Sequence, residues 1–401
     1  MEKFTRYLKD AWALTQALYA PKKASFINVS LGNVSGDMDS VVCSIVLGYY
    51  LTYKQGFYEE VKDEIDPENL SEEQQKKFFV PVLNMNKEDI VARSDIIHHF
   101  ELNGINYMEI PAYDEIDLRH YAEQGTLRAN LVDHNFPDCN QEYLVEHVER
   151  IYDHHFEKPA EYPNMVFKDI RFCGSAATLV ANAMLNDEEL KSELLDHQVA
   201  WFASAPILID TVNFKEKQRG KKWDQIDEDV YKLVKEIAGD TIPEDYFRTL
   251  YLKKTDVQTN INLGFRLLAR KDYKNYKIND ELLGISTIFL DINICDNEFG
   301  AENLVKEFDD IMKERNLSMY MVLTHYEEDH DVRRQILAYS HNTELVEKLK
   351  DLFSNGEDFS TEPLTENKLN DIENCYVWQN NYTSQSRKKI EPLIRKHFAV
   401  E

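Results

Sequence analysis

The chain has 401 residues, more than the roughly 250–300 at which a single hydrophobic core stops growing, so we expect two domains. Apolar residues make up 43% of the sequence, which excludes a disordered chain. The formal net charge of −26 opposes non-specific binding to nucleic acid and to anionic membranes, and we expect neither as a partner.

The five cysteines form no CxxC pair and their number is odd, which excludes a zinc ribbon or a disulfide framework and indicates a reducing compartment. The first 26 residues mix charges of both signs, which predicts an amphipathic helix and not a signal peptide. Apolar runs fall short of the ~20 residues that a membrane span needs. We therefore expect a cytoplasmic protein and, because its acidic surface has no long apolar stripe, a monomer.

The first half of the chain alternates strand-like and helix-like segments. A helix is predicted over 40–51, and strands are predicted at 26–31, 78–85, 105–110, 130–132 and 150–153. This alternation is typical of α/β proteins with a doubly wound, mostly parallel sheet covered by helices.

Beyond Gly174 the sequence becomes helical over 175–185 and from 190 to 210, and then polar and basic. A second, smaller α/β domain is expected to follow, with helices at 227–237, 243–269 and 343–352 and strands at 283–290, 318–324 and 335–340. The predicted division is a catalytic domain over 1–210, a basic connector over 211–225 and a second domain over 226–401.

Asp37 and Asp39 stand between the first predicted strand and the helix that follows it. Alternate residues of an extended loop can direct both carboxylates at one pair of metal ions. An acidic turn in which Ser40 caps the helix explains the pair equally well.

Asp133 and Asp153 each follow a short apolar run, and each precedes a histidine. His154 is a natural nitrogen ligand for a divalent ion, with Asp153 orienting an imidazole, and His155 can contact a phosphate oxygen or the leaving group. Asp210 ends the run APILID and can bridge two metals from the opposite wall. Parallel strands bring such clusters to one sheet edge, where paired divalent ions activate water for attack on phosphorus.

Basic residues are concentrated in two segments of this acidic chain. The first contains Lys215, Lys217, Arg219, Lys221 and Lys222, and the second contains Arg387, Lys388, Lys389, Arg395 and Lys396. Such local reversals of charge suit a polyphosphate track, although a solvated helix face is the alternative. The Gly174-Ser175 opening of a helix can also face an anion, but this signal is weak.

Taken in order, these clusters resemble the motifs of the DHH phosphoesterases, which include manganese-dependent inorganic pyrophosphatases, prune-type proteins and cytosolic exopolyphosphatases. The matching segments are Gly32-Asn33, Asp37-Met38-Asp39-Ser40, Asp133-His134-Asn135, Asp153-His154-His155, Asp210 and Ser386-Arg387-Lys388. The resemblance implies two domains that close over a substrate cleft. It also implies phosphate contacts from His155, Arg387 and Lys388, and metal ligation by Asp37, Asp39, Asp133, His154 and Asp210.

The pyrophosphatase branch has His where this chain has Asn33, so Asn33 and Met38 resemble the exopolyphosphatase branch instead. An amide oxygen is a poorer ligand for soft ions than imidazole, which favours Mg²⁺. We expect an exopolyphosphatase that releases terminal orthophosphate from inorganic polyphosphate with two ions, Mg²⁺ or Mn²⁺. The residues expected to act in catalysis are His155, Asp133 and Asp210, and those expected to bind substrate are Asn33, His155, Lys215, Arg387 and Lys388.

Three alternatives stay open at this point. The first is a pyrophosphatase or a cyclic-nucleotide or oligonucleotide phosphodiesterase of the same superfamily. The second is a nuclease, which needs base-stacking aromatics, and Trp223, Trp378 and Tyr382 are candidates for these. A non-catalytic interaction protein is less favoured, because the Asp and His set is intact.

Overall fold

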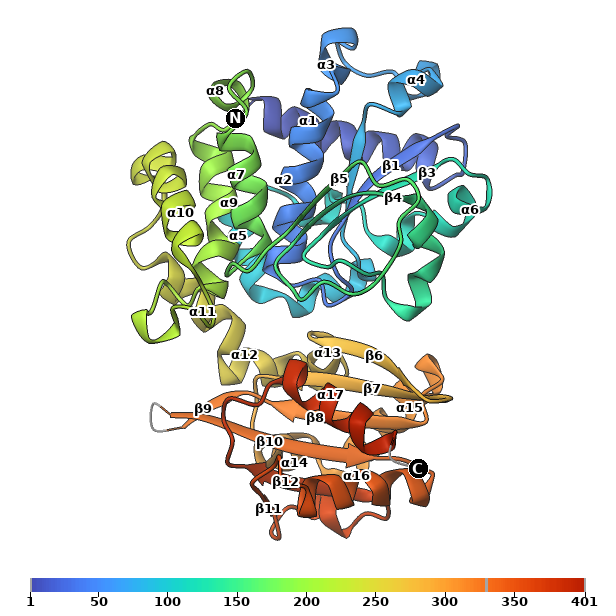
Figure 1. Cartoon of the computed structure of the whole chain (residues 1–401), viewed down its shortest axis with the longest axis vertical. Coiled ribbons are helices and arrows are strands. Elements are labelled where there is room, and N and C mark those ends of the chain that lie inside the picture. The colour runs from blue at the N-terminus through green and yellow to red at the C-terminus, as the bar shows by residue number, and fades with distance from the viewer. Residues whose placement is uncertain (1, 329–330, 400–401) are drawn as a thin grey trace. The chain divides into compact units, whose positions relative to one another are not determined.

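The computed structural model describes residues 2–328 and 331–399, and the chain divides into two compact units between Leu252 and Lys253 (Figure 1). The sequence places this division within 211–225 instead. The difference arises because the amphipathic helix α10 (Gln225–Ala238) buries Val230 and Val234 in the core of the first unit. Each unit is described below by itself.

The first unit is built on a five-stranded sheet with the order β2-β1-β3-β4-β5. Its strands are β1 (Ile27–Leu31), β2 (Phe79–Val82), β3 (Leu127–Val132), β4 (Val148–Asp153) and β5 (Phe167–Ile170), and all neighbours run parallel. The chain passes from β1 outward to β2 and then returns to β3 on the other side. This reversal makes a topological switch point between β1 and β3, as the predicted doubly wound sheet requires.

The strand predicted at 105–110 is wrong. That segment contains a short 3₁₀ turn, Tyr107–Glu109, and the residues that follow it meet the end of β2 in an isolated bridge between Leu83 and Ala112. β5, which the sequence analysis did not predict, lies at the sheet edge with a partly exposed sequence, FKDI. Its exposure explains why it lacks the apolar run of a buried strand.

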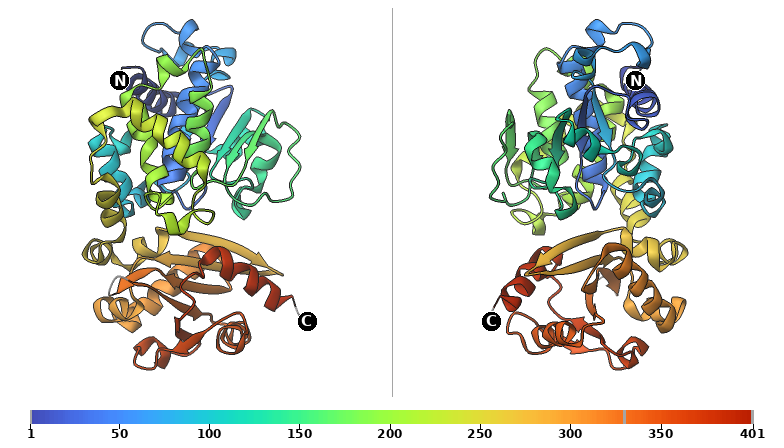
Figure 2. Two further views of the ribbon diagram at one scale, coloured as in Figure 1. Left: turned by 60° about the vertical axis from the view of Figure 1, so that its left-hand side comes forward. Right: turned by 90° about the vertical axis from the view of Figure 1, so that its right-hand side faces the viewer.

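Four helices pack against one another beside the sheet: α2 (Met38–Lys54), α7 (Ala176–Leu185), α9 (His197–Asp210) and α10 (Figures 1 and 2). Residues 38–52 of α2 are all buried, because α2 contacts β1, β2, α7 and α9. An apolar surface on every side of the helix is what such a position requires. The other helices of this unit are α1 (Glu2–Leu14), α3 (Phe57–Glu60), α4 (Glu72–Gln75), α5 (Ser94–Leu102), α6 (Leu118–Glu123), α8 (Lys191–Leu194) and α11 (Tyr246–Thr255).

The basic stretch after α9 is anchored to the first unit and is not a free connector. Val212, Asn213 and Phe214 all adopt the left-handed conformation, with φ between 51° and 56°, and turn the chain back. The ring of Phe214 then packs edge-on against buried Trp223, whose indole N–H donates to the Lys215 carbonyl (3.1 Å). The lysines between these anchors stay exposed.

The second unit contains a mixed sheet with the order β11-β12-β10-β8-β7-β6, and β9 pairs with β10. Its strands are β6 (Tyr273–Ile278), β7 (Glu281–Ile288), β8 (Met319–Thr324), β9 (Tyr326–Glu328), β10 (Asp331–Tyr339), β11 (Thr361–Pro363) and β12 (Cys375–Asn380). Only β7 and β8 run parallel among the described strand pairs of this sheet; the other pairs are antiparallel.

Alternation along β8 divides the second unit into two cores. Met319 and Met321 face one core, with α16 (Thr343–Asn355) and α17 (Arg387–Phe398), whereas Tyr320 and Val322 face the other. The second core is closed by α13 (Gly264–Arg270), α14 (Ile292–Phe299) and α15 (Ala301–Arg315), which follow α12 (Val257–Asn262). The predicted smaller α/β domain is therefore confirmed, with strands that the sequence analysis did not find.

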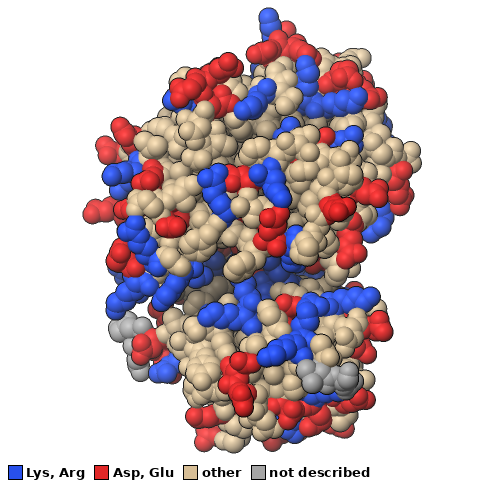
Figure 3. Space-filling model, viewed as in Figure 1, with Lys and Arg blue, Asp and Glu red and all other residues tan. Residues whose placement is uncertain are grey.

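All five cysteines are free thiols. Among the described residues, the helices are too short or too polar to cross a membrane. Figure 3 shows acidic and basic side chains interspersed over the face in view.

Gly48 in α2 offers a test of the packing between α2 and β2. A Cβ atom at this position would contact the Tyr7 hydroxyl, which donates to the Phe79 carbonyl (2.8 Å), and would lie 3.0 Å from that carbonyl oxygen. We expect Gly48→Ala to lower the free energy of unfolding in urea by about 1–3 kcal/mol, although alanine favours a helix. Adding Tyr7→Phe removes the obstructing oxygen, so the double variant should lose less stability than the sum of the two single changes. Strict additivity would contradict this packing.

Candidate metal centre

The switch point of the first sheet gathers the acidic residues that the sequence analysis singled out. After β1 the chain runs to Asp37, the N-cap of α2, whose carboxylate accepts a hydrogen bond from the Ser40 amide (3.1 Å). Asp37 therefore caps the helix, and Ser40 does not. Buried Asp39 lies in the first turn of the same helix.

Asp133 directly follows β3 and is buried in the left-handed conformation, with φ of 59°. Aspartate tolerates this conformation better than most residues, and its occurrence at a strand end marks a constrained position. Its Oδ2 atom accepts hydrogen bonds from the Ser40 hydroxyl (2.7 Å) and the Asn33 amide (2.5 Å). Its Oδ1 atom lies 3.2 Å from His154 Nε2.

His154 is held in one tautomer by the backbone. Its Nδ1 atom lies 3.0 Å from the carbonyl oxygen of Cys173, which can only accept, so Nδ1 carries the hydrogen. Its Nε2 atom lies 3.2 Å from Asp133 Oδ1 and 3.8 Å from Asp39 Oδ2. A protonated ring pairs with these carboxylates directly, whereas a cation bound between the oxygens would take the Nε2 lone pair of the neutral ring.

Asp153 anchors the other histidine. Its Oδ1 atom accepts from the backbone amides of His154 (2.8 Å) and His155 (3.2 Å) and from His155 Nδ1 (2.8 Å), while Asn135 donates to Oδ2 (2.5 Å). Burial acts to raise the pKa of Asp153, but the hydrogen bond from His155 and the charges of both imidazoles lower it overall. Asp153 is therefore ionised, and its contact with Nδ1 orients the imidazole of His155.

Asp39 is held by the start of α7. The Ser175 hydroxyl (2.7 Å) and the amide of Ala177 (2.9 Å) donate to Oδ1, and the amide of Ala176 (2.7 Å) donates to Oδ2. The helix start at Gly174-Ser175, which the sequence suggests as an anion site, thus binds the carboxylate of Asp39. The Cys43 thiol also contacts Asp39 Oδ1 (3.1 Å).

Electrostatics at the centre favour a cation. Burial, followed by the charge of Asp210, raises the pKa of Asp39 to about 7, although His154 acts to lower it. Burial, followed by the charges of Asp37 and Asp39, raises the pKa of Asp133 to about 8. A divalent cation would relieve this repulsion, and the ligand atoms of Asp133, Asp153, His154 and His155 lie within 4.8 Å of one another. The donor set therefore fits a divalent metal.

The remaining predicted residues have distinct positions. Asn33 donates from its amide nitrogen to Asp133, and its amide oxygen accepts from the backbone of Ser35 (2.8 Å), so the side chain supports Asp133. Asp210 is the last residue of α9 and acts on Asp39 through its charge. Exposed Lys215 follows the left-handed turn of the first unit.

Arg387 and Lys388 begin α17 of the second unit. Arg387 forms an ion pair with Asp272 (2.6 Å), and Lys388 is exposed. Of the candidate stacking aromatics, Trp223 and Trp378 are each only 2% exposed and belong to the packed interior, whereas Tyr382 is 47% exposed. The nuclease alternative therefore loses two of its three aromatics.

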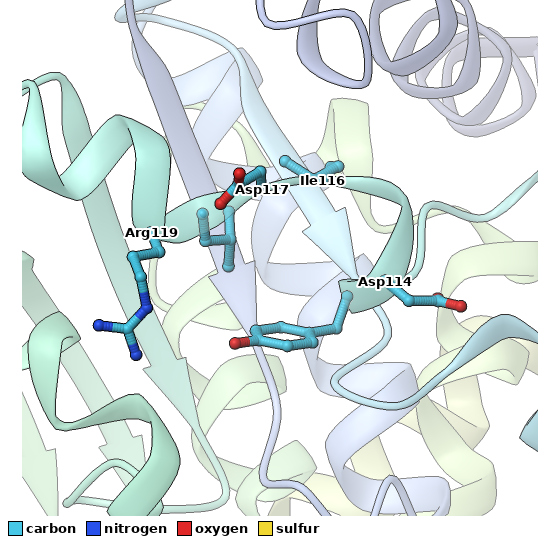
Figure 4. Close-up of a pocket in the computed structure, with 6 residues that line it drawn as sticks. Asp114, Ile116, Asp117 and Arg119 are labelled. Carbon is cyan, nitrogen blue, oxygen red and sulfur yellow. The ribbon is translucent and has the colours of Figure 1, made fainter.

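A surface hollow of about 310 Å³ lies apart from these residues and is lined by Tyr113, Asp114, Ile116, Asp117, Leu118 and Arg119 (Figure 4). Its carboxylates are engaged, since Asp117 pairs with Lys22 (2.6 Å) and Asp114 accepts from the Lys87 amide (2.9 Å). We assign no function to it.

The fold and the centre together define a two-unit α/β protein whose parallel sheet carries, at its switch point, a carboxylate–imidazole cluster that fits a divalent cation. A crystal structure from Methanococcus jannaschii, described provisionally as a family II inorganic pyrophosphatase, has the same fold, with a TM-score of 0.60, 17% identity, and coverage of 93% of this chain and all of that one. A family model, the DHHA2 domain, matches residues 253–397. The second unit is thus similar to a DHHA2 domain, and the chain as a whole has the fold of the Methanococcus jannaschii protein.

Curated relatives are similar over both units. "Exopolyphosphatase PRUNE1" of Homo sapiens is 26% identical over 374 residues, which cover 92% of this chain and 75% of that protein. A Schizosaccharomyces pombe protein, provisionally named an exopolyphosphatase, is 27% identical over 92% of this chain and 90% of its own length. The Rattus norvegicus PRUNE1 protein is 29% identical over 71% of this chain, and the match spans only 56% of that protein.

The raised pKa values predict how metal and pH act together on stability. The folded values of about 7 for Asp39 and about 8 for Asp133 exceed the unfolded value of about 3.9, so the stability from these groups is present below pH 4 and is lost as pH rises through 8. Excess Mg²⁺ or Mn²⁺ should therefore raise the Tm more at pH 8.5 than at pH 5.5, measured as the difference from metal-free protein. Asp133→Asn should reduce this difference, and a metal effect equal at both pH values would refute the cation site.

Proposed function

We propose that the chain is an exopolyphosphatase that releases terminal orthophosphate from inorganic polyphosphate with the help of two divalent ions, Mg²⁺ or Mn²⁺. The observation that carries this proposal is the buried contact of His154 with Asp133 and Asp39, where repulsion between carboxylates favours a cation. The names of the human and fission-yeast relatives support polyphosphate as the substrate. We also propose a cytoplasmic location, which the five free thiols support.

In this proposal Asp37, Asp39, Asp133, His154 and Asp210 hold the ions. Bound divalent ions lower the pKa of water and neutralise charge on a transferring phosphoryl group. Asp133 and Asp210 would lie beside the reacting water. His155 donates its Nδ1 hydrogen to Asp153 and directs its other nitrogen at a phosphate oxygen.

The second unit supplies the phosphate grip in this proposal. Arg387 is held by Asp272 through one guanidinium nitrogen, and another donates to the Asp272 carbonyl (2.9 Å). A guanidinium restrained in this way loses little rotamer entropy when it binds phosphate. Lys388 and Lys215 add mobile positive charge, so polyphosphate affinity should weaken as salt screens them.

A pyrophosphatase is the second candidate, supported by the fold shared with the Methanococcus jannaschii protein. The contacts of Asn33 count against it. The side chain that replaces the histidine of that branch is engaged with Asp133 and Ser35. An amide nitrogen offers no lone pair to a metal, and the amide oxygen, which could, already accepts from Ser35.

Phosphate release from long-chain polyphosphate and from pyrophosphate, with Mg²⁺, with Mn²⁺ and without metal, tests the proposal directly. We expect metal-dependent release from the polymer while pyrophosphate stays intact. Asp133→Asn should reduce kcat on the order of 10²–10⁴-fold, because it removes a charge at the reacting centre. Turnover of pyrophosphate alone would select the second candidate. Metal-independent release would exclude both.

Arg387→Ala tests the phosphate grip, and Arg395→Ala is its matched control on the same helix. Arg395 is also ion-paired, with Glu391 (2.6 Å), and its side chain is 51% exposed; it belongs to the same basic segment but is not among the residues expected to bind substrate. Loss of a charged hydrogen bond predicts that Arg387→Ala lowers kcat/KM for polyphosphate about tenfold to hundredfold. Equal effects of the two changes would show that only general charge matters.

A further inference from the structure

The loop Cys173–Ser175 contacts two residues of the metal centre, the imidazole of His154 and the carboxylate of Asp39. The carbonyl of Cys173 fixes the tautomer of His154 (3.0 Å), and the hydroxyl of Ser175 donates to Asp39 (2.7 Å). His154 follows β4 and Asp39 begins α2, so one loop orients two proposed ligands from separate elements. Its position therefore sets the distance between them.

Asp227 of α10 holds this loop from the side opposite the centre. Its side chain is fully buried, with 0% exposure. The Gly174 amide donates to Oδ2 (2.8 Å), and the Thr178 hydroxyl, in the first turn of α7, donates to Oδ1 (2.6 Å). The Asp224 amide completes the set (2.9 Å). One carboxylate thus ties both the loop and the start of α7 to α10.

The loop has little room to move away from Asp227. A Cβ atom on Gly174 would lie 2.7 Å from the Lys222 carbonyl oxygen and 2.7 Å from the Thr211 methyl group. These neighbours belong to the anchored stretch 211–223, which the Phe214–Trp223 ring contact fastens. Gly174 is therefore packed between Asp227 and the anchored stretch 211–223.

We propose that Asp227 is a positioning residue for the metal centre, which sets Asp39 and His154 at the spacing that a divalent cation needs. It acts through the loop Cys173–Ser175 and touches neither metal nor substrate. The inference rests on the metal centre of the proposed function. Residues that orient metal ligands in this indirect way typically contribute 10–100-fold to metal affinity.

Mn²⁺ binding to metal-free protein tests this role, with kcat and KM for polyphosphate and urea unfolding measured beside it. We expect Asp227→Ala to raise the Kd for Mn²⁺ by about 10–100-fold. Asp227→Asn keeps an oxygen that can accept from Gly174 and should recover part of that loss. Gly174→Ala displaces the same loop while Asp227 stays intact, and it should raise the Kd about tenfold even if Asp227→Ala does not fold.

Thr52→Val is the matched control for lost stability. The Thr52 hydroxyl accepts from the Phe79 amide (3.0 Å) and donates to the Gly48 carbonyl (2.8 Å), and it is as buried as Asp227. It lies about 20 Å along α2 from Asp39 at 1.5 Å per residue. This variant should lose stability and keep the wild-type Kd.

A wild-type Kd in Asp227→Asn and in Gly174→Ala, or an equal rise in Kd in Thr52→Val, would overturn the positioning role. Wild-type protein that binds Mn²⁺ but releases no phosphate from polyphosphate would defeat the proposed function alone. The ratio of Kd values would still decide the role of Asp227. Wild-type protein that binds no Mn²⁺ would overturn both.

Discussion

Repulsion between buried carboxylates at the switch point is the constraint on which the first unit depends. Asp39 and Asp133 cannot both be ionised without compensation, and burial makes their mutual repulsion stronger than it would be in water. Each carboxylate receives its own donors, from the start of α7 for Asp39 and from Ser40 and Asn33 for Asp133. These hydrogen bonds fix the oxygens but leave charge that either protons or a cation would balance.

The two histidines have different hydrogen-bond partners in this network. The carbonyl of Cys173 leaves His154 with a lone pair directed at the carboxylates, whereas Asp153 keeps His155 paired and oriented. Neighbouring residues of one motif thus suit the separate roles proposed for them, ligation and substrate contact, because their hydrogen-bond partners differ. The second unit carries its own fixed cation in Arg387, which Asp272 restrains.

The sequence was sufficient to predict the parallel sheet and the residues that gather at its edge, because Asp133 and Asp153 end short apolar runs and Asp37 follows another within a short loop. It was insufficient wherever a partner lies far along the chain: Ser175 meets Asp39 across 136 residues, and no local pattern marks that contact. The apolar residues near 105–110 imitate a strand but pack as a turn. The unit boundary was misplaced because basic residues concealed the anchoring role of Trp223.

The hydrogen bond from the loop Cys173–Ser175 to α10 bears on when the nascent chain can bind a metal ion. A nascent polypeptide exposes Asp37 and Asp39 early and His154 midway, but Asp227 emerges only after every ligand has been made. A chain that stops at residue 210 would contain all the proposed ligands and lack the carboxylate that spaces them. During translation a metal ion would therefore bind with the proposed spacing of ligands only after α10 has been synthesised and has packed on the first unit.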